Sequence, residues 1–276
     1  MNNLVLRIIT ALVGVVIIIG SIFVDRTAFY AVFMLIGFLT HLEYVRTTSA
    51  TPARGKWIVM GLPLAFGIMI MTLQTGIING LLYNYIQNDV LIELLLLIIP
   101  ITLIVELYLK REFPFQQVGL TVLGLLYVVF PFGLYMNYGA GNFQQAFALG
   151  LLCLVWSNDT FAYFAGRLFG KNKLFESISP KKTWEGFIGG LLCTMACGFV
   201  LSRFYPEYIS ATQWIVLGLV VSVAGTFGDL VESMLKRSVQ IKDSGSLLPG
   251  HGGFLDRFDG FMFAVPAAVF YIDFIR

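Results

Sequence analysis

The sequence predicts an all-α membrane protein, a polytopic bundle of about nine transmembrane helices with its N-terminus in the cytoplasm. Hydrophobic residues make up 58% of the 276 residues, charged residues make up 12%, and the mean hydropathy is +0.82. A soluble domain carries about 25% charged residues. The apolar residues form runs of roughly 20, which is the length of helix that crosses a bilayer. These observations exclude an ordinary soluble domain.

Nine apolar runs are long enough to be predicted as spans. They cover residues 4–24, 28–45, 57–74, 90–109, 117–137, 146–166, 184–204, 212–235 and 254–275. Beside the third run, residues 72–86 are also compatible with a partial extra span or an interfacial helix. An odd number of spans places the two termini on opposite sides of the membrane.

The basic residues test this topology, because cytoplasmic loops carry an excess of Lys and Arg. Fifteen of the 18 basic residues fall on the side of the N-terminus: Arg7, Arg46, Arg54, Lys56, Lys110, Arg111, Arg167, Lys171, Lys173, Lys181, Lys182, Lys236, Arg237, Lys242 and Arg257. The other side has Arg26, Arg203 and Arg276. We therefore expect the polar loops 167–183 and 236–253 to face the cytoplasm. The net charge of +2 is too small to indicate a nucleic-acid partner.

The two halves of the chain differ in chemistry, although residues 1–276 are expected to form a single integral membrane domain. Residues 1–138 are predicted to be scaffold or interface spans, and residues 139–276 to hold the catalytic spans and loops. In the first half, Glu43, Glu93 and Glu106 lie in or near apolar runs. We expect interfacial or paired structural roles for them, with a substrate pathway as the alternative.

A basic loop follows a span that carries an acidic residue. Asp159 lies near the middle of an apolar run, and the loop after it contains Arg167, Lys171, Lys173, Lys181 and Lys182. Thr183, before Trp184-Glu185-Gly186, is expected to cap a helix N-terminus. Free N–H groups at such a terminus, together with nearby basic side chains, favour phosphate binding. The alternative is that the lysines only follow the topology rule. Gly186, Gly189 and Gly190 are explained by close helix packing.

The stretch from Gly228 to Gly260 gathers charged residues at the ends of two spans. Asp229, Ser233, Lys236 and Arg237 recur at helical spacing and share one face, as do Asp256 and Asp259. Ionised groups at membrane depth are costly and are functional by default. Carboxylates with one or two ligands from each helix suit Mg²⁺, which keeps waters and recruits substrate phosphates. Between the spans, KDSGSLLPGHGG predicts a tight loop for close approach of phosphate, with His251 as a donor or a loop-fixing residue.

The spacing of these residues matches a known pattern. It comprises Ser233-x-x-Lys236-Arg237, Lys242-Asp243, Pro249-Gly250-His251-Gly252-Gly253 and Asp256-Arg257-x-Asp259, preceded by Gly228-Asp229-Leu230 and by Ser179-Pro180-Lys181-Lys182-Thr183-Trp184-Glu185-Gly186. This closely resembles the signature of the phosphatidate cytidylyltransferases, also called CDP-diacylglycerol synthases. The matched stretches cover roughly residues 156–260. Phe161 and Gly260 depart from the pattern, and neither departure removes a charged group.

The resemblance implies the Mg²⁺-dependent reaction of CTP with phosphatidic acid, giving CDP-diacylglycerol and pyrophosphate. It implies Asp229, Asp256, Lys242 and His251 as catalytic residues. The implied metal ligands are Asp229, Asp256, Asp259 and Asp159, with Asp159 either holding a second cation or pairing with a lysine. The implied substrate-binding residues are Lys181, Lys182, Thr183, Ser233, Lys236, Arg237, Asp243 and Arg257. The expected partners are the two substrates and the lipid bilayer, the expected location is a bacterial plasma membrane, and a homodimer is left open.

Three other functions are alternatives. Asp256-x-x-Asp259-Gly260 also begins the motif of CDP-alcohol phosphatidyltransferases, but the continuation FMFAVPAAVFYIDFIR lacks the rest of it. A CTP-dependent lipid-alcohol kinase is the nearer enzymatic alternative. A cation or lipid transporter would show paired broken helices in two related halves, whereas here the charge lies in one half of the chain.

Overall fold

The computed structural model describes residues 3–48, 56–74, 89–139, 144–245, 247–248 and 252–276, and these residues are mostly helical. The helices are α1 (Asn3–Val24), α2 (Arg26–Thr48), α3 (Lys56–Gln74), α5 (Asp89–Leu109), α6 (Pro114–Gly124), the π-helix η1 (Leu125–Val129), α7 (Phe130–Gly139), α8 (Gln144–Phe169), α9 (Trp184–Phe204), α10 (Ala211–Ser238) and α11 (Leu255–Ile275). Because η1 joins α6 to α7 without a break, these three form one long helical segment. The predicted all-α class is confirmed.

Seven helical segments among the described residues are long and apolar enough to cross a membrane. They are Arg7–Val24, Arg26–Thr48, Pro114–Gly139, Gln145–Phe169, Trp184–Phe204, Ala211–Ser238 and Leu255–Ile275. Helices α3 and α5 contribute shorter apolar stretches, Gly61–Thr72 and Leu96–Leu109. The chain is therefore a polytopic integral membrane protein, and the count of nine spans stays a prediction. The extra segment considered at 72–86 lies mostly in residues 75–88, outside the described part of the chain.

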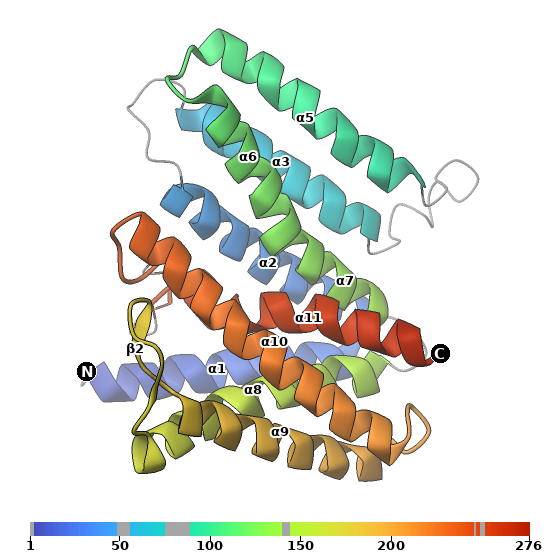
Figure 1. Ribbon diagram of the computed structural model, residues 1–276. Coiled ribbons are helices and arrows are strands. Elements are labelled where there is room, and N and C mark those ends of the chain that lie inside the picture. The colour runs from blue at the N-terminus through green and yellow to red at the C-terminus, as the bar shows by residue number, and fades with distance from the viewer. Residues whose placement is uncertain (1–2, 49–55, 75–88, 140–143, 246, 249–251) are drawn as a thin grey trace.

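The long helices run back and forth across the bundle (Figure 1). The N-terminus, strand β2 and the C-terminal end of α10 lie at one end of the bundle, and the C-terminus lies at the opposite end (Figure 1). This arrangement agrees with the separation of the termini that an odd span count requires. Which end faces the cytoplasm stays a prediction based on the basic residues.

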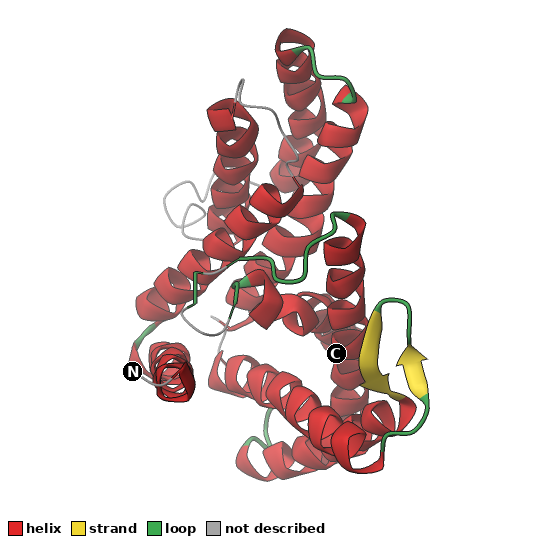
Figure 2. Ribbon diagram, turned by 90° about the vertical axis from the view of Figure 1, so that its left-hand side faces the viewer, coloured by secondary structure: helices red, strands yellow, loops and turns green. Residues whose placement is uncertain are grey.

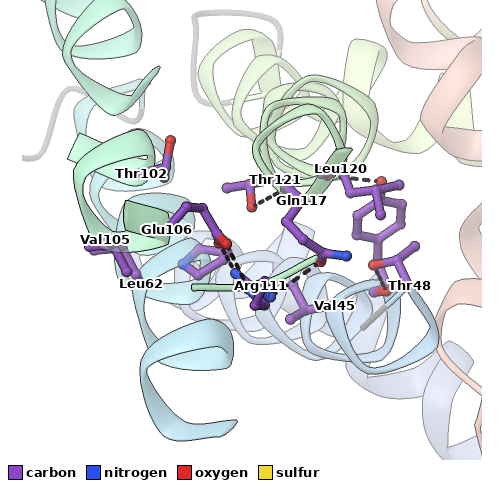
Figure 3. Close-up of a pocket in the computed structure, with 12 residues that line it drawn as sticks. Val45, Thr48, Leu62, Thr102, Val105, Glu106, Arg111, Gln117, Leu120 and Thr121 are labelled. Atoms are coloured by element: carbon purple, nitrogen blue, oxygen red, sulfur yellow. Dashed lines mark hydrogen bonds and ion pairs between the residues drawn. The ribbon is translucent and has the colours of Figure 1, made fainter. Parts of the chain in front are cut away.

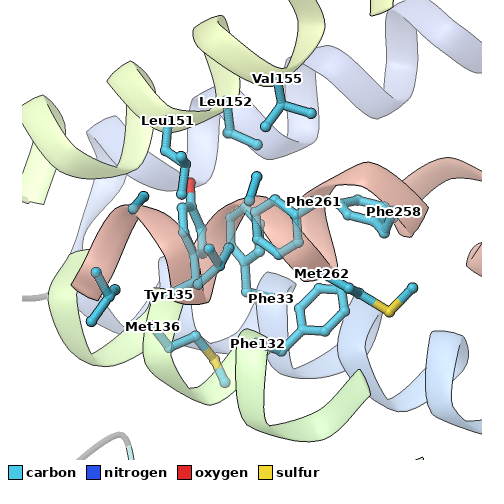
Figure 4. Packing of buried hydrophobic residues seen from close by; sticks show 14 of the residues in the cluster. Phe33, Phe132, Tyr135, Met136, Leu151, Leu152, Val155, Phe258, Phe261 and Met262 are labelled. Carbon is cyan, nitrogen blue, oxygen red and sulfur yellow. The ribbon is translucent and has the colours of Figure 1, made fainter. Parts of the chain in front are cut away.

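Aromatic side chains tie the two halves of the chain together in the core. Phe33 of α2, Tyr135 of α7 and Phe261 of α11 meet in one buried cluster (Figure 4). The ring centroids of Phe33 and Tyr135 are 4.7 Å apart, and those of Tyr135 and Phe261 are 4.9 Å apart. Such pairs contribute about 0.5–1.5 kcal/mol each beyond the burial of their surface. The first half is thus packed directly on the last helix.

Helices α8 and α9 approach closely where α9 carries small residues. A Cβ added at Gly186 would lie 2.8 Å from the Ala162 carbonyl oxygen, and one at Gly190 would lie 2.9 Å from the Ala162 Cβ. Small residues let membrane helices pack backbone to backbone. The packing role predicted for the glycines at the start of α9 is confirmed.

A short antiparallel hairpin, β1 (Lys173–Phe175) and β2 (Ser179–Thr183), stands between α8 and α9 (Figure 2). The sequence was expected to form only a loop here, because strands of three and five residues are too short to give a readable periodicity. Glu185 fixes the hairpin by accepting hydrogen bonds from the Lys171 N–H at 3.1 Å and the Asn172 Nδ2 at 2.7 Å. Thr183 Oγ1 accepts from the Gly186 N–H at 3.1 Å, so the predicted N-cap is confirmed.

Candidate active site

A cavity of about 320 Å³ opens between the hairpin and helices α8, α9 and α10. Five of the predicted substrate-binding and metal-binding residues line it: Asp159, Lys181, Lys182, Thr183 and Asp229. They come from three separate stretches of the chain, which the hairpin and the close α8–α9 packing bring together. The cavity therefore combines two lysines and two carboxylates beside the N-terminus of α9, a combination that suits a phosphate-bearing ligand.

Lys182 links the hairpin to helix α10. Its Nζ lies 2.6 Å from Asp229 Oδ2, and it also donates a hydrogen bond of 3.3 Å to the Thr226 carbonyl oxygen. Ser233, one turn after Asp229, donates to Asp229 Oδ1 at 3.3 Å. The Lys182 side chain is 24% exposed and that of Asp229 is 35% exposed, so both remain accessible from the cavity.

Three carboxylates from three helices lie close together at this cavity, and two of them, Asp159 and Asp229, line it. Asp159 of α8, Asp229 of α10 and Asp259 of α11 lie within electrostatic range of one another. Like charges held so close repel one another, and a bound cation or a nearby ammonium group relieves that repulsion. Lys182 and Arg257 also lie within electrostatic range of Asp159.

A buried polar network, which the sequence analysis did not identify, supports these carboxylates. Ser222 Oγ donates to Asn158 Oδ1 at 2.6 Å, and Asn158 Nδ2 donates to Thr226 Oγ1 at 3.4 Å. All three side chains are almost fully buried. Asn158 directly precedes Asp159, and the Thr226 carbonyl oxygen accepts a hydrogen bond from Lys182. The network therefore fixes the position of α8 relative to α10 at the site. The feature of the sequence that could have indicated this network is Asn158 beside Asp159 in an apolar run.

The donor set fits a magnesium ion only as a partial shell. Within the described ranges, no group of three or more His, Cys, Asp or Glu side chains is arranged to hold a metal. Mg²⁺ needs one or two carboxylates, keeps several waters and takes its remaining ligands from substrate phosphates. Asp159 and Asp229, which line the same cavity as the lysines, meet that requirement. Asp259 stands behind them within electrostatic range.

Asp256, the fourth predicted metal ligand, takes part in an ion-pair network. Lys236 Nζ lies 2.7 Å from Asp256 Oδ1 and 2.6 Å from Glu232 Oε2. Glu232 is fully buried, and apart from the Lys236 ion pair its oxygens have no hydrogen-bond partner among the described residues. The sequence analysis missed Glu232, although its position four residues before Lys236 on one helix is the spacing of an ion pair.

Asp256 also forms hydrogen bonds with both ends of the loop between α10 and α11. Its Oδ2 accepts hydrogen bonds of 3.0 Å from the Ser244 N–H and of 3.0 Å from the Gly253 N–H. Gly252 has a φ of +84°, which only glycine adopts readily. The Leu248 N–H donates to the Gly252 carbonyl oxygen at 3.0 Å. The predicted tight turn is present in these residues.

The other predicted site residues lie around the same loop. Lys242 and Asp243 are exposed, and so is Arg257 on the first turn of α11. Arg237 is exposed as well and donates to the Ile241 carbonyl oxygen at 3.4 Å. His251 lies outside the described residues. The structure thus groups Lys181, Lys182, Asp159 and Asp229 in the cavity and places Lys236 with Asp256.

A second pocket lies in the first half of the chain, between α2, α3, α5 and α6 (Figure 3). Its volume of about 30 Å³ leaves room for one or two water molecules and excludes an organic substrate. Arg111 reaches into it between Glu106, with which it forms an ion pair, and Gln117 (Figure 3). The paired structural role predicted for Glu106 is confirmed.

Comparison with known proteins agrees with this geometry. The sequence model of the cytidylyltransferase family matches residues 5–275. A phosphatidate cytidylyltransferase of Bacillus subtilis is 30% identical over 267 residues, which is 96% of this chain and 96% of the relative. A protein of the same name from Staphylococcus saprophyticus is 38% identical over 209 residues, 75% of this chain and 77% of the relative. One from Staphylococcus aureus is 39% identical over 210 residues, with the same coverage. The chain belongs to the cytidylyltransferase family.

Proposed function

We propose that this chain transfers the cytidylyl group of CTP to phosphatidic acid, giving CDP-diacylglycerol and pyrophosphate. The family match over nearly the whole chain supports the nucleotidyl transfer, and the relatives, which are phosphatidate cytidylyltransferases, support phosphatidate as the acceptor. The observation that carries the proposal is the cavity in which Lys181 and Lys182 face Asp159 and Asp229 beside a helix N-terminus.

The reaction requires alignment of the two substrates more than it requires a strong base. An oxygen of the lipid phosphate, already ionised at neutral pH, attacks the α-phosphorus of CTP. A new P–O bond forms as the bond to the β-phosphate breaks, and pyrophosphate leaves. Transfers of this kind are accelerated mainly by alignment and by positive charge around the phosphates. Both substrates are anions, so their mutual repulsion is the barrier that the protein must offset.

Each group of residues has a distinct task in this scheme. Lys181 and Lys182 bind phosphate oxygens in the cavity. Lys236 and Arg237 at the end of α10, and Lys242 in the loop after it, supply further positive charge. Thr183, Ser233, Asp243 and Arg257 complete the substrate contacts, and His251 serves the leaving group. Asp229 and Asp159 would hold Mg²⁺ from the cavity, with Asp259 within electrostatic range of both, and Asp256 is the fourth proposed ligand. When bound, Mg²⁺ neutralises the charge that develops on the phosphate oxygens.

We propose that the reaction takes place at the cytoplasmic face of a bacterial plasma membrane. The hairpin and the end of α10 lie at the end of the bundle that holds the N-terminus (Figure 1), and the predicted topology assigns fifteen of the 18 basic residues to the side of the N-terminus. CTP is a cytosolic solute and phosphatidic acid is a membrane lipid, so an active site at the cytoplasmic face of the membrane is accessible to both substrates. The homodimer left open by the sequence stays a prediction, which light scattering of the detergent-purified protein tests.

Two radiolabels separate this reaction from its alternatives. Detergent-purified protein is incubated with phosphatidic acid, Mg²⁺ and CTP labelled at the α- or the γ-phosphate. We expect the α-label to enter the lipid and the γ-label to appear in pyrophosphate. Transfer of the γ-label to a lipid would indicate a kinase. Solute uptake into vesicles with CTP left intact would indicate a transporter and refute the proposal.

A further inference from the structure

Glu43, in the last two turns of helix α2, reaches from the first half of the chain to the predicted catalytic loop. Glu43 is 1% exposed, and its carboxylate lies between the two ends of the connection that joins α10 to α11. We call these two segments, residues 242–245 and 252–255, the loop ends. The sequence analysis expected an interfacial or paired role for this glutamate. No Lys or Arg ion pair to Glu43 occurs among the residues that the structure describes.

The contacts of Glu43 are directed at both loop ends. Glu43 Oε2 accepts a hydrogen bond of 2.9 Å from the Leu255 N–H and one of 3.3 Å from Ser244 Oγ. One turn further along α2, Thr47 Oγ1 donates to the Ser244 carbonyl oxygen at 3.4 Å. Leu255 is the first residue of α11, and the residue before it, Phe254, caps the helix with no side-chain hydrogen bond. Glu43 therefore supplies an acceptor for a helix N-terminus that lies 212 positions later in the chain.

The backbone closes tightly around this carboxylate. A Cβ added at Gly245 would lie 2.5 Å from Glu43 Oε1, and a Cβ added at Gly253 would collide with Glu43 Oε2 and Ser244 Oγ. Gly245 and Gly253 belong to opposite loop ends. Their lack of a side chain is thus explained by the approach of Glu43, which no feature of the local sequence indicates.

Apolar packing alone does not account for a carboxylate at this position. Removing an ionised group from water costs several kcal/mol unless donors replace the lost hydration. Here both donors to Glu43 Oε2 belong to the loop ends, and Glu43 Oε1 is buried without a hydrogen-bond partner among the described residues, so the buried carboxyl group depends on the loop ends for its hydrogen bonds. A second carboxylate, Asp256, binds the same ends from the other side through the Ser244 and Gly253 N–H groups.

We propose that Glu43 is a positioning residue for the active site, which joins the two loop ends and so fixes the start of α11, on which Asp256 and Asp259 stand. Glu43 touches neither substrate in this proposal and acts through the loop ends. The first half of the chain is then part of the catalytic apparatus, in addition to its role as scaffold. The catalytic consequence rests on the proposed function, while the structural consequence does not.

Hydrogen–deuterium exchange and steady-state kinetics on the full-length protein in detergent test the proposal together. The variants are Glu43→Ala, which removes the acceptor, and Glu43→Gln, which keeps one acceptor oxygen of the same reach. Glu106→Gln is the matched control, because Glu106 is also a buried glutamate of the first half and pairs with Arg111 away from the loop. Exchange is followed in peptides covering 242–245 and 252–258.

In Glu43→Ala we expect exchange in these peptides to be at least about ten times faster, because the hydrogen bonds to the Glu43 carboxylate are lost. We expect kcat/KM for CTP to fall about 10- to 100-fold, because the residues at the start of α11 are then misplaced in the active site. Glu43→Gln should restore part of both, and Glu106→Gln should leave loop exchange within about twofold of wild type. If Glu43→Ala fails to fold, the same comparison is made with Glu43→Gln.

Two results would overturn the proposal: unchanged loop exchange with lost activity, or faster loop exchange with wild-type activity. A wild-type protein without cytidylyl transfer would refute the proposed function alone, because the exchange measurement would still report whether Glu43 holds the loop ends.

Discussion

The ammonium group of Lys182 lies 2.6 Å from the carboxylate of Asp229, and this ion pair joins the β2 strand to helix α10 across the cavity. The two residues are 47 positions apart, and they meet because the hairpin folds back over the start of α9. In the absence of substrate the pair keeps each charge compensated. In the proposed reaction, a bound phosphate would compete for the lysine and a bound cation for the aspartate, so the pair would separate when substrate and metal enter.

Replacing Lys182 by Ala should lower kcat/KM for CTP or phosphatidic acid by about 10- to 100-fold, since a hydrogen bond to a charged group contributes about 1.5–3 kcal/mol. Lys171 is the matched control, because it lies on the same exposed connection and does not line the cavity. Steady-state assays of Lys182→Ala and Lys171→Ala check this. Equal losses in the two variants would indicate a general effect of positive charge on the surface.

Replacing Asp229 by Asn should raise the Mg²⁺ concentration needed for half-maximal activity, because one ionised ligand is lost from the proposed metal shell. Activity should disappear when EDTA removes the metal from the wild-type protein and return when Mg²⁺ is restored in excess. Glu207→Gln, an exposed acidic residue in the α9–α10 connection, is the control. A titration curve for Asp229→Asn that coincides with wild type would remove Asp229 from the metal shell.

The membrane helices could be predicted from the sequence because apolar runs of the right length report directly on the bilayer. The nine predicted runs correspond to helical segments, and the Thr183 cap and the packing glycines of α9 follow from local rules. The β1–β2 hairpin could not be predicted in this way. Its strands are short, and its geometry depends on Glu185 accepting hydrogen bonds from a segment more than ten residues earlier.

The arrangement of the predicted site residues could be foreseen from the sequence only in part. Helical spacing places Asp229 near Ser233, and the structure shows their hydrogen bond of 3.3 Å. No spacing rule links Asn158 to Ser222, or Glu43 to Leu255, because these contacts arise from the packing of helices that are distant in the chain. Lys236 was assigned to phosphate from its motif, whereas the structure also gives it two carboxylate partners.

Replacing Lys236 by Met should destabilise the protein by about 3–5 kcal/mol, because it leaves buried carboxylates without their counter-charge. Glu232 is fully buried and pairs with Lys236, while the Asp256 side chain is 12% exposed and accepts hydrogen bonds from the Ser244 and Gly253 N–H groups in addition to its ion pair with Lys236. The double variant Lys236→Met/Glu232→Leu should recover part of the loss, since it removes one of the orphaned charges. Unfolding in SDS titrations of detergent-solubilised protein measures these free energies.

Lys242→Met is the control for that experiment, because Lys242 is exposed. It should change the free energy of unfolding by less than about 0.5 kcal/mol, as surface substitutions usually do. A loss in Lys236→Met no larger than that in Lys242→Met would show that the buried network contributes nothing to stability.

Replacing Gly190 by Ala should reduce both stability and activity, because α9 has no room for a side chain where it crosses α8. The added Cβ would lie 2.9 Å from the Ala162 Cβ, 3.0 Å from Asn158 Oδ1 and 3.1 Å from the Asn158 carbonyl oxygen. Overpacking of this kind costs about 1–3 kcal/mol. The displaced residue, Asn158, precedes Asp159 and bonds to Ser222, so the disturbance reaches the site.

Gly119→Ala separates this steric effect from the general effect of removing a helical glycine. A Cβ at Gly119 of α6 would meet no atom within 4 Å, so this variant should be as stable as wild type or slightly more stable. Thermal unfolding in detergent and the cytidylyl-transfer assay, applied to both variants, provide the comparison. A wild-type melting temperature and wild-type activity in Gly190→Ala would mean that α8 and α9 can separate without cost, and that the Asn158 network does not depend on their contact.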